Sequence, residues 1–145
     1  MVNRILYLIG KNEETTMRLE SAFLCDCVDF TEKGLLNAYG MGIHALSFSK
    51  LPDKRPIMLV IAIEYDSVKD SGTHTIGIRI IDSDGRGVIK PIKMDDKFPT
   101  TARYYALDTK LYPTFDKYET HSVEVTLDGN NIASLPLDVV QESLK

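Results

Sequence analysis

Clusters of positive charge are missing from this chain of 145 residues. Its 17 lysines and arginines are outnumbered by 21 aspartates and glutamates, and no basic run is longer than a pair. A surface that binds the phosphate backbone of nucleic acid needs clustered lysine and arginine. The sequence therefore argues against a nucleic-acid partner.

Long apolar runs are missing as well. No run approaches the ~20 residues that span a bilayer, so we expect no membrane segment. The first apolar run, Ile5–Gly10, has six residues, fewer than the ~7–15 of a signal-peptide core, and it lacks a small-residue cleavage site. We therefore expect a cytoplasmic protein.

Cysteine is scarce, and both cysteines, Cys25 and Cys27, lie beside Asp26 and Asp29 in the stretch that looks most like a site. On one strand the two cysteines would be roughly 6.6 Å apart, whereas the Cβ atoms of a disulfide lie about 3.8 Å apart. Zinc needs four ligands, usually from Cys-x2–4-Cys pairs, and no second pair is present. We expect free thiols packed in the core, with no disulfide and no metal.

Apolar and polar residues alternate along most of the chain, which is the pattern of half-buried antiparallel strands. The predicted strands are Leu19–Val28, Ala38–Phe48, Ile57–Tyr65, Thr73–Asp82, Gly87–Ile92, Tyr104–Leu111, Tyr118–Leu127 and Ile132–Val140. Ile57–Ile63 is apolar on both faces, which predicts a central strand. The pattern predicts an all-β fold, an antiparallel two-layer β-sandwich that is immunoglobulin-like or jelly-roll-like.

Two Asp-Gly pairs, Asp84-Gly85 and Asp128-Gly129, predict hairpin turns, because glycine adopts a positive φ without strain. The segment Asp82–Gly85 also resembles the start of a calcium loop. An EF-hand loop would need a glutamate at its twelfth position, where Met94 and Asp95 lie nearby, and helices rather than strands on its flanks. The sequence favours a structural type I′ hairpin over the alternative of a calcium site between loops.

Residues 4–9 (RILYLI) are apolar on both faces of a strand, yet they precede the core pattern, which begins near Met17. We therefore divide the chain into an N-terminal extension, residues 1–16, with one strand and the linker Gly10–Thr16, and a β-sandwich domain, residues 17–145. An exposed strand of this kind would be a sticky patch, so we expect it to pair with a free sheet edge. That edge belongs to its own sandwich or to a second copy, and we predict a contribution to a homodimer.

A second candidate site lies in the segment NAYGMGIH. On one strand, Gly40, Gly42 and His44 would share a face with room for a bulge, a close backbone or a ligand. Together with Asp26 and Asp29 they form the candidate ligand-binding set. We assign no catalytic residue, because the sequence has no Gly-x-Ser-x-Gly elbow and does not place a histidine beside a nucleophile.

Three segments, AFLCDCVDF, GLLNAYGMGIHAL and VEVTLDGNNIASLPLDVV, together resemble a family of small bacterial all-β proteins classed as a domain of unknown function. The shared features are a Leu-Cys-Asp opening, a Gly-Leu-Leu-Asn segment that leads to Gly-x-Gly, and a terminal Leu-Asp-Gly hairpin. The resemblance covers about Arg18 to Val140 and implies an all-β fold in a bacterial cytosol. It implies no activity, substrate or catalytic residue.

The sequence thus predicts a non-catalytic binding or protein-interaction module, not an enzyme, with no cofactor and with a protein partner or a second copy as its target. The first alternative is a small-ligand sensor with a pocket near Gly40–His44. The second is a hydrolase that uses Asp26, Asp29 or His44 in a cleft. A closed apolar core would favour the module, a polar cavity the sensor, and a histidine–carboxylate contact in a cleft the hydrolase.

Overall fold

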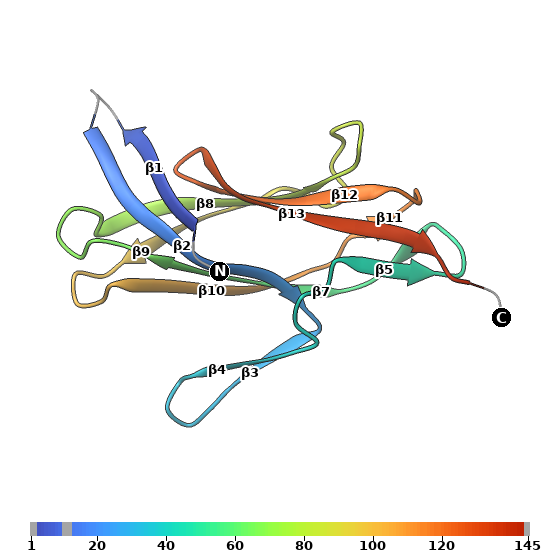
Figure 1. Cartoon of the computed structure of the whole chain (residues 1–145), viewed down its shortest axis with the longest axis horizontal. Helices are drawn as coiled ribbons and strands as arrows, with labels where there is room; N and C mark the ends of the chain where they lie inside the picture. Colours follow the sequence, from blue (N-terminus) through green and yellow to red (C-terminus); the bar gives the residue numbers. More distant parts are fainter. Residues whose placement is uncertain (1–2, 10–12, 144–145) are drawn as a thin grey trace.

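The computed structural model describes residues 3–9 and 13–143, by the backbone alone up to residue 16, and these residues form a β-sandwich without helices (Figure 1). The first sheet has the order β1 (Asn3–Ile9), β2 (Glu13–Cys25), β7 (Ile57–Glu64) and β10 (Tyr104–Leu111). The second has the order β5 (Ala45–Phe48), β13 (Asn130–Gln141), β12 (Thr120–Leu127), β8 (Gly72–Ile81) and β9 (Ile92–Phe98). The predicted fold class is confirmed.

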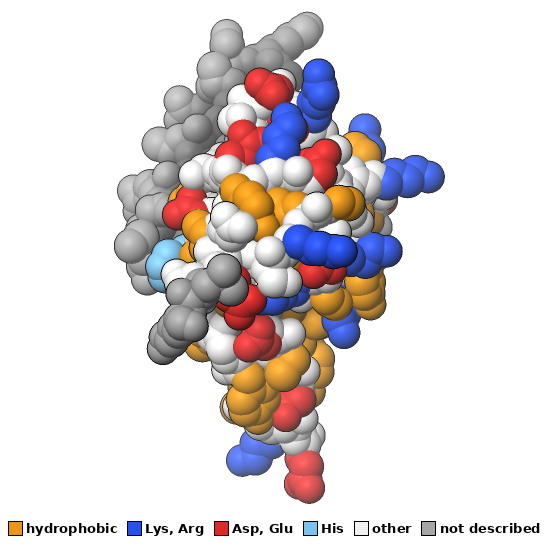
Figure 2. Space-filling model, turned by 90° about the vertical axis from the view of Figure 1, so that its right-hand side faces the viewer, with side chains coloured by type: hydrophobic (Ala, Val, Ile, Leu, Met, Phe, Trp, Pro, Cys, Tyr) orange, Lys and Arg blue, Asp and Glu red, His pale blue; other side chains and the backbone are white. Residues whose placement is uncertain are grey.

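Two short strand pairs lie outside these sheets. β6 (Asp53–Lys54) pairs with β11 (Thr114–Phe115), and β3 (Cys27–Phe30) pairs with β4 (Leu36–Tyr39). The β3–β4 pair projects away from the sandwich in Figure 1 and forms the narrow lower part of the molecule in Figure 2.

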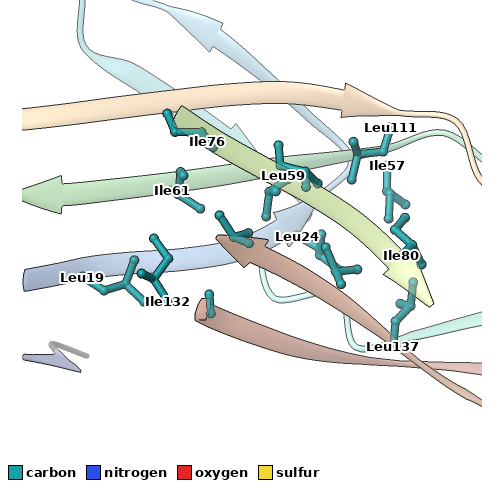
Figure 3. Packing of buried hydrophobic residues seen from close by; sticks show 14 of the residues in the cluster. Leu19, Leu24, Ile57, Leu59, Ile61, Ile76, Ile80, Leu111, Ile132 and Leu137 are labelled. Atoms are coloured by element: carbon teal, nitrogen blue, oxygen red, sulfur yellow. The ribbon is translucent and has the colours of Figure 1, made fainter. Parts of the chain in front are cut away.

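The core lies between the sheets, because alternating side chains of each sheet point inward. The inward sets are fully or almost fully buried in one cluster (Figure 3): Ile57, Leu59, Ile61 and Ile63 of β7, Ile76, Ile78 and Ile80 of β8, and Val123, Val125 and Leu127 of β12. β7 lies between β2 and β10, and Val60 is also buried, at 5% exposed. The prediction of a central strand at Ile57–Ile63 is therefore confirmed.

β1 pairs with β2 in an antiparallel hairpin, from Asn3 opposite Leu19 to Ile9 opposite Glu13. Residues 4–9 are therefore paired within their own chain, while a homodimer through them stays a prediction. β2 crosses the predicted boundary between residues 16 and 17 without a break, so Glu13–Thr16 belong to a strand and not to a linker. Residues 10–12 of the predicted linker lie outside the described residues.

Two predicted strands are not continuous in the structure, so their predicted bounds are wrong. Leu19–Val28 bends at Asp26, and Ala38–Phe48 is interrupted over residues 40–44. Gly40 and Gly42 have φ angles of 65° and 78°, which no regular strand contains. After this break β5 runs parallel to β13, with Ala45 opposite Asp138, in sheets that are otherwise antiparallel.

The predicted strand Gly87–Ile92 is also wrong. Gly87 makes one isolated bridge to Ile81, and β9 begins only at Ile92, directly after Pro91. Proline has no N–H to donate to a ladder, which explains the late start of the strand.

The two Asp-Gly turns have different backbone conformations. The hairpin turn predicted at Asp128-Gly129, between β12 and β13, is confirmed, and its φ angles of 51° and 85° make it a type I′ turn. At the other turn only Gly85 has a positive φ, 81°, and its N–H donates to the Asp82 carbonyl oxygen. This is a type I turn followed by a left-handed glycine, so the predicted type I′ geometry is wrong there.

Candidate functional site

The β3–β4 ribbon, residues Cys27–Tyr39, is called the arm below. Its cross-strand pairs are Cys27 with Tyr39, Val28 with Ala38, Asp29 with Asn37, and Phe30 with Leu36. At the tip, the Thr31 N–H donates to the Leu35 carbonyl oxygen at 2.8 Å, and Gly34 has a φ of 77°. The tip thus closes as a tight turn with the glycine in a left-handed conformation.

The arm has two chemically different faces, because residues directly opposite each other share a face and successive residues alternate. One face is entirely apolar and consists of Val28, Ala38, Phe30 and Leu36. The other consists of Cys27, Tyr39, Asp29 and Asn37, and on it the Tyr39 hydroxyl donates to an Asp29 carboxylate oxygen at 3.1 Å.

Large apolar side chains are exposed at the end of the arm, whereas Val28, Leu36 and Ala38 of its apolar face are half-buried. Phe30 on that face is 58% exposed, Leu35 at the tip is 64% exposed, and Met41, just beyond the arm, is 61% exposed. In Figure 2, hydrophobic side chains gather on the narrow lower part of the molecule. An isolated two-stranded hairpin is marginally stable in water and gains stability by packing its apolar face. Phe30, Leu35 and Met41 therefore place exposed apolar surface on and beside the arm.

Phe30, Leu35 and Met41 were not among the site residues predicted from the sequence. The signal was present, because Val28 and Phe30 alternate with Cys27 and Asp29, and Glu32–Gly34 is a turn-forming tip. It was hidden because the predicted strand Leu19–Val28 was extended through Asp26 and ended before Phe30.

The base of the arm contains the predicted residues Asp26 and Gly40. The Asp26 N–H donates to the Tyr39 carbonyl oxygen at 3.0 Å. A Cβ on Gly40 would lie 2.5 Å from Asp26 Oδ2, so the carboxylate packs directly on the glycine backbone. Together with its positive φ, this contact explains why the position needs glycine.

Gly42 and His44 lie in the segment that leads from the arm to β5. The N–H groups of Gly42 and Ile43 both donate to the Leu24 carbonyl oxygen, at 2.9 and 3.1 Å, and fix this segment to the end of β2. His44 is exposed, its Nδ1 lies 3.1 Å from the Gly42 carbonyl oxygen, and its own carbonyl accepts from the Asp138 N–H. In the described part of the chain, the His44 ring forms no hydrogen bond or ion pair with Asp26 or Asp29.

The five predicted ligand-binding residues therefore lie in one region but have different surroundings. Asp26 and Gly40 are in contact, Asp29 is on the polar face of the arm, and Gly42 and His44 follow the arm. Their described contacts shape and anchor the base of the arm. Ligand binding by this set stays a prediction.

The two cysteines lie on either side of the bend at Asp26 and have different surroundings. Both are free; Cys25 is buried at the end of β2, and Cys27 is exposed on the arm. Burial raises the pKa of the Cys25 thiol. The prediction that both pack in the core of one strand is wrong for Cys27, because the bend turns it out of the sheet.

A partly buried histidine–carboxylate contact occurs elsewhere, at His74 and Asp128. Nδ1 of His74 lies 2.6 Å from Asp128 Oδ2, and its Nε2 lies 2.5 Å from the Asp70 carbonyl oxygen. The ring also packs on Phe98, with the ring centroids 4.3 Å apart. Asp128 borders a hollow of about 690 Å³ on the outer face of the second sheet, next to Gly77. Because both ring nitrogens are engaged, His74 has no free nitrogen to act as a base at this hollow.

The Asp82–Arg86 turn is organised by a lysine. Lys117 Nζ lies 3.2 Å from Asp82 Oδ2, 3.1 Å from Asp84 Oδ2 and 3.9 Å from Glu119 Oε1. The ammonium group supplies the positive charge that a calcium ion would supply there. The N–H groups of Asp84 and Arg86 both donate to Asp82 Oδ1 at 2.9 Å, so Asp82 holds the turn together.

A groove opens beside the base of the arm, between the edges of β2 and β13. We call it the slot; it has a volume of about 570 Å³ and is lined by Leu19, Ser21, Ala22, Phe23, Met41, Ile132, Ala133, Ser134 and Leu135. No charged residue is among these lining residues. Met41, within the predicted pocket region Gly40–His44, thus lines a groove, but its lining is mainly apolar and includes neither His44 nor the two glycines.

The described residues hold neither a metal-binding group of side chains nor a membrane-spanning helix. No group of three or more His, Cys, Asp or Glu side chains in this part of the chain is arranged to hold a metal ion. In the same residues, no helix has the length and apolar character needed to cross a membrane.

The fold and the arm define the class of this protein as a β-sandwich with a projecting amphipathic hairpin. The model of the family of unknown function DUF6941 matches residues 20–140, and the chain belongs to this family. The predicted membership of an uncharacterised family is thereby confirmed. No curated protein sequence matches the chain.

Solved structures of two glycosyl hydrolase family 2 members are similar to part of the chain. Both are from Bacteroides cellulosilyticus, the second from strain DSM 14838, with 14% and 13% sequence identity and TM-scores of 0.47 and 0.48. The matches cover 60% and 63% of this chain but only 12% and 13% of those chains. This chain therefore spans about an eighth of their length, and no activity is inferred from them.

Proposed function

We propose that the chain is a non-catalytic protein-interaction module of the bacterial cytosol that binds its protein partner through the apolar face of the arm. The observation that carries this proposal is the 58% exposure of Phe30 on that face, beside the 64% exposed Leu35 at the tip, on a ribbon that projects from a sandwich with its own buried core. Large apolar side chains in such a position lose favourable burial unless a partner covers them.

The non-catalytic part of the proposal is supported by the surroundings of the histidines. His74 has both ring nitrogens engaged, and His121 is buried, with Nδ1 3.0 Å from the Glu119 carbonyl oxygen. No described histidine hydrogen-bonds to a serine, threonine or cysteine side chain, the arrangement that activates a nucleophile. The cytosolic part is supported by the exposed free thiol of Cys27, since reducing compartments preserve such thiols.

The test compares two variants of the tagged full-length chain in bacterial cells. Phe30→Asp places a charge on the apolar face of the arm, and Asn37→Asp places the same charge on the opposite face one residue from Leu36. We expect proteins that co-purify with the wild-type chain to be retained by Asn37→Asp and lost with Phe30→Asp. Equal melting temperatures of the two variants would show that the fold is intact in both.

The proposal is wrong if the proteins that co-purify specifically with the wild-type chain are retained equally by Phe30→Asp and Asn37→Asp. It is also wrong if no protein, including a second copy of the chain, co-purifies with the wild type.

A further inference from the structure

The described part of the chain has both an apolar projection with an exposed Phe30 and a mainly apolar groove. We propose that two copies of the chain bind each other reciprocally, with the apolar face of each arm in the slot of the other copy. This inference rests on the proposed function, because it uses the same face of the arm, and it names the partner as a second copy.

The slot matches the arm in chemical character. Its walls include the inward side chains Leu19 and Ile132, which lie side by side at one end of the core cluster in Figure 3. The slot lining and the apolar face of the arm both lack charged residues. Their contact therefore requires no charge to be removed from water, which would be costly without a partner charge.

The edge of β13 beside the slot is not suited to accept an additional strand. Ile132 is extra in the ladder, because Val125 is opposite Ala133 and Thr126 is opposite Asn131. The Ala133 N–H already donates to Asn131 Oδ1 at 3.1 Å, and Pro136 has no N–H. A bulge and a proline are devices that protect an edge from strand pairing. The slot therefore takes apolar side chains and does not extend a sheet.

The area that one arm can bury favours a reciprocal pair over a single contact. Phe30 is 58% exposed and Val28, Leu36 and Ala38 are half-buried, so the apolar face of the arm exposes on the order of 250 Å². One arm in one groove would remove roughly 500 Å² from water, counting both partners, which is the size of a non-specific contact. Two arms in two slots would remove roughly 1,000 Å², which is the smallest size of a specific interface.

The arm and the slot adjoin through Met41. This residue follows Gly40 at the base of the arm and also lines the slot. A two-fold axis near Met41 would therefore place each arm beside the slot of the other copy. Such an exchange is isologous and closes at two copies, so it does not continue into a filament.

The experiment measures mass by light scattering over a concentration series of the full-length chain. We expect twice the chain mass of 16.3 kDa for the wild type and for the control Asn37→Asp. Phe30→Asp disables the arm, and Ala22→Leu fills the slot from its wall. Each should raise the dimer dissociation constant by about thirtyfold or more, the effect of losing a strong interface residue. Met41→Glu, at an exposed position, is the second slot variant in case Ala22→Leu impairs folding.

A mixture of Phe30→Asp with Ala22→Leu provides the specific test of reciprocity. The first variant keeps its slot and the second keeps its arm, so the mixture retains one of the two contacts. We expect a weak heterodimer in the mixture, at concentrations where each variant alone is monomeric.

Three results would overturn the inference. A wild-type chain that is monomeric throughout the series excludes the dimer. The proposed function then stands if Phe30→Asp still loses the proteins that co-purify with the wild type. Both the inference and the proposed function fail if no protein co-purifies. A dimer that is unaffected by both slot variants shows that arms pack on arms. A dimer that survives Phe30→Asp but is lost on removal of residues 1–9 shows that β1 forms the interface.

Discussion

Cys25 and Cys27 have different accessibility although only Asp26 separates them. Cys25 is buried and its thiol has a raised pKa, chiefly because of desolvation, and the thiolate is the reactive form. We expect a thiol reagent such as dithionitrobenzoate to modify one cysteine in the native chain and both in denaturant. Cys27→Ser should abolish the native reaction. Reaction of two thiols at equal rates in the native chain would contradict the described bend at Asp26.

Asp82 and Asp84 look equivalent in the sequence, but in the structure they contribute differently to the stability of the turn. Asp82 is 6% exposed and accepts two backbone N–H donors, whereas the side chain of Asp84 is 63% exposed and contacts Lys117. We expect Asp82→Ala to lower the melting temperature by several degrees, because two backbone donors lose their acceptor. Asp84→Ala should change it little, since exposed ion pairs contribute little. Equal losses in the two variants would contradict this assignment.

The same carboxylate predicts a dependence of stability on pH. Hydrogen bonds from the Arg86 N–H and from Lys117 lower the pKa of Asp82 below its unfolded value of about 3.9. Its stabilising contribution is therefore complete above about pH 4 and is lost as the pH falls through the folded pKa. In urea unfolding between pH 2 and pH 6, Asp82→Asn should flatten the acid limb of the stability curve. An unchanged acid limb in this variant would contradict the prediction.

At the scale of elements, alternation predicted the strands that belong to the two-sided core. It succeeded at Ile57–Ile63 and at the Asp128-Gly129 hairpin, because burial and turn geometry there depend on neighbouring residues. It failed over residues 40–44, where the chain leaves one sheet for the other. The acceptor for Gly42 and Ile43 is Leu24, and the parallel partner of Ala45 is Asp138, both far away in the sequence.

The sequence predicted the region of the candidate site but not its apolar surface, because exposure also depends on long-range contacts. Asp26, Asp29 and Gly40 were singled out, and all three belong to the arm or its base. Phe30 is exposed because no distant segment of the described chain packs on it. A single sequence does not show which distant segments will be in contact.

Gly40 and Gly42 provide a matched pair of substitutions at the base of the arm. Both have a positive φ, so alanine at either position should cost about 1 kcal/mol of unfolding free energy. Only at Gly40 would the new Cβ also meet a neighbour, Asp26 Oδ2 at 2.5 Å, whereas nothing lies within 4 Å of Gly42. We therefore expect a larger loss for Gly40→Ala in urea unfolding. Asp26→Gly should restore part of it, and equal losses would show that the Asp26 contact does not matter.

At the scale of the whole molecule, β1 is an integral edge of the first sheet. It pairs with β2 over all seven of its residues, from Asn3 to Ile9. A chain that begins at Glu13 keeps β2 but uncovers its edge, so we expect a lower melting temperature and more aggregation than in the full-length chain. Equal melting temperatures and equal light-scattering masses would show that β1 is dispensable for both stability and association.

The central claim is that the apolar face of the arm contacts a protein in the cell. Photocrosslinking at single positions tests it most directly, with benzoylphenylalanine in place of Phe30 on the apolar face or in place of Asn37 on the polar face. The two residues belong to the same ribbon and are both exposed, so they differ mainly in the direction of their side chains. The account predicts a discrete crosslinked protein from position 30 and a much weaker product from position 37. Equal products from both positions, or none from position 30, would contradict it.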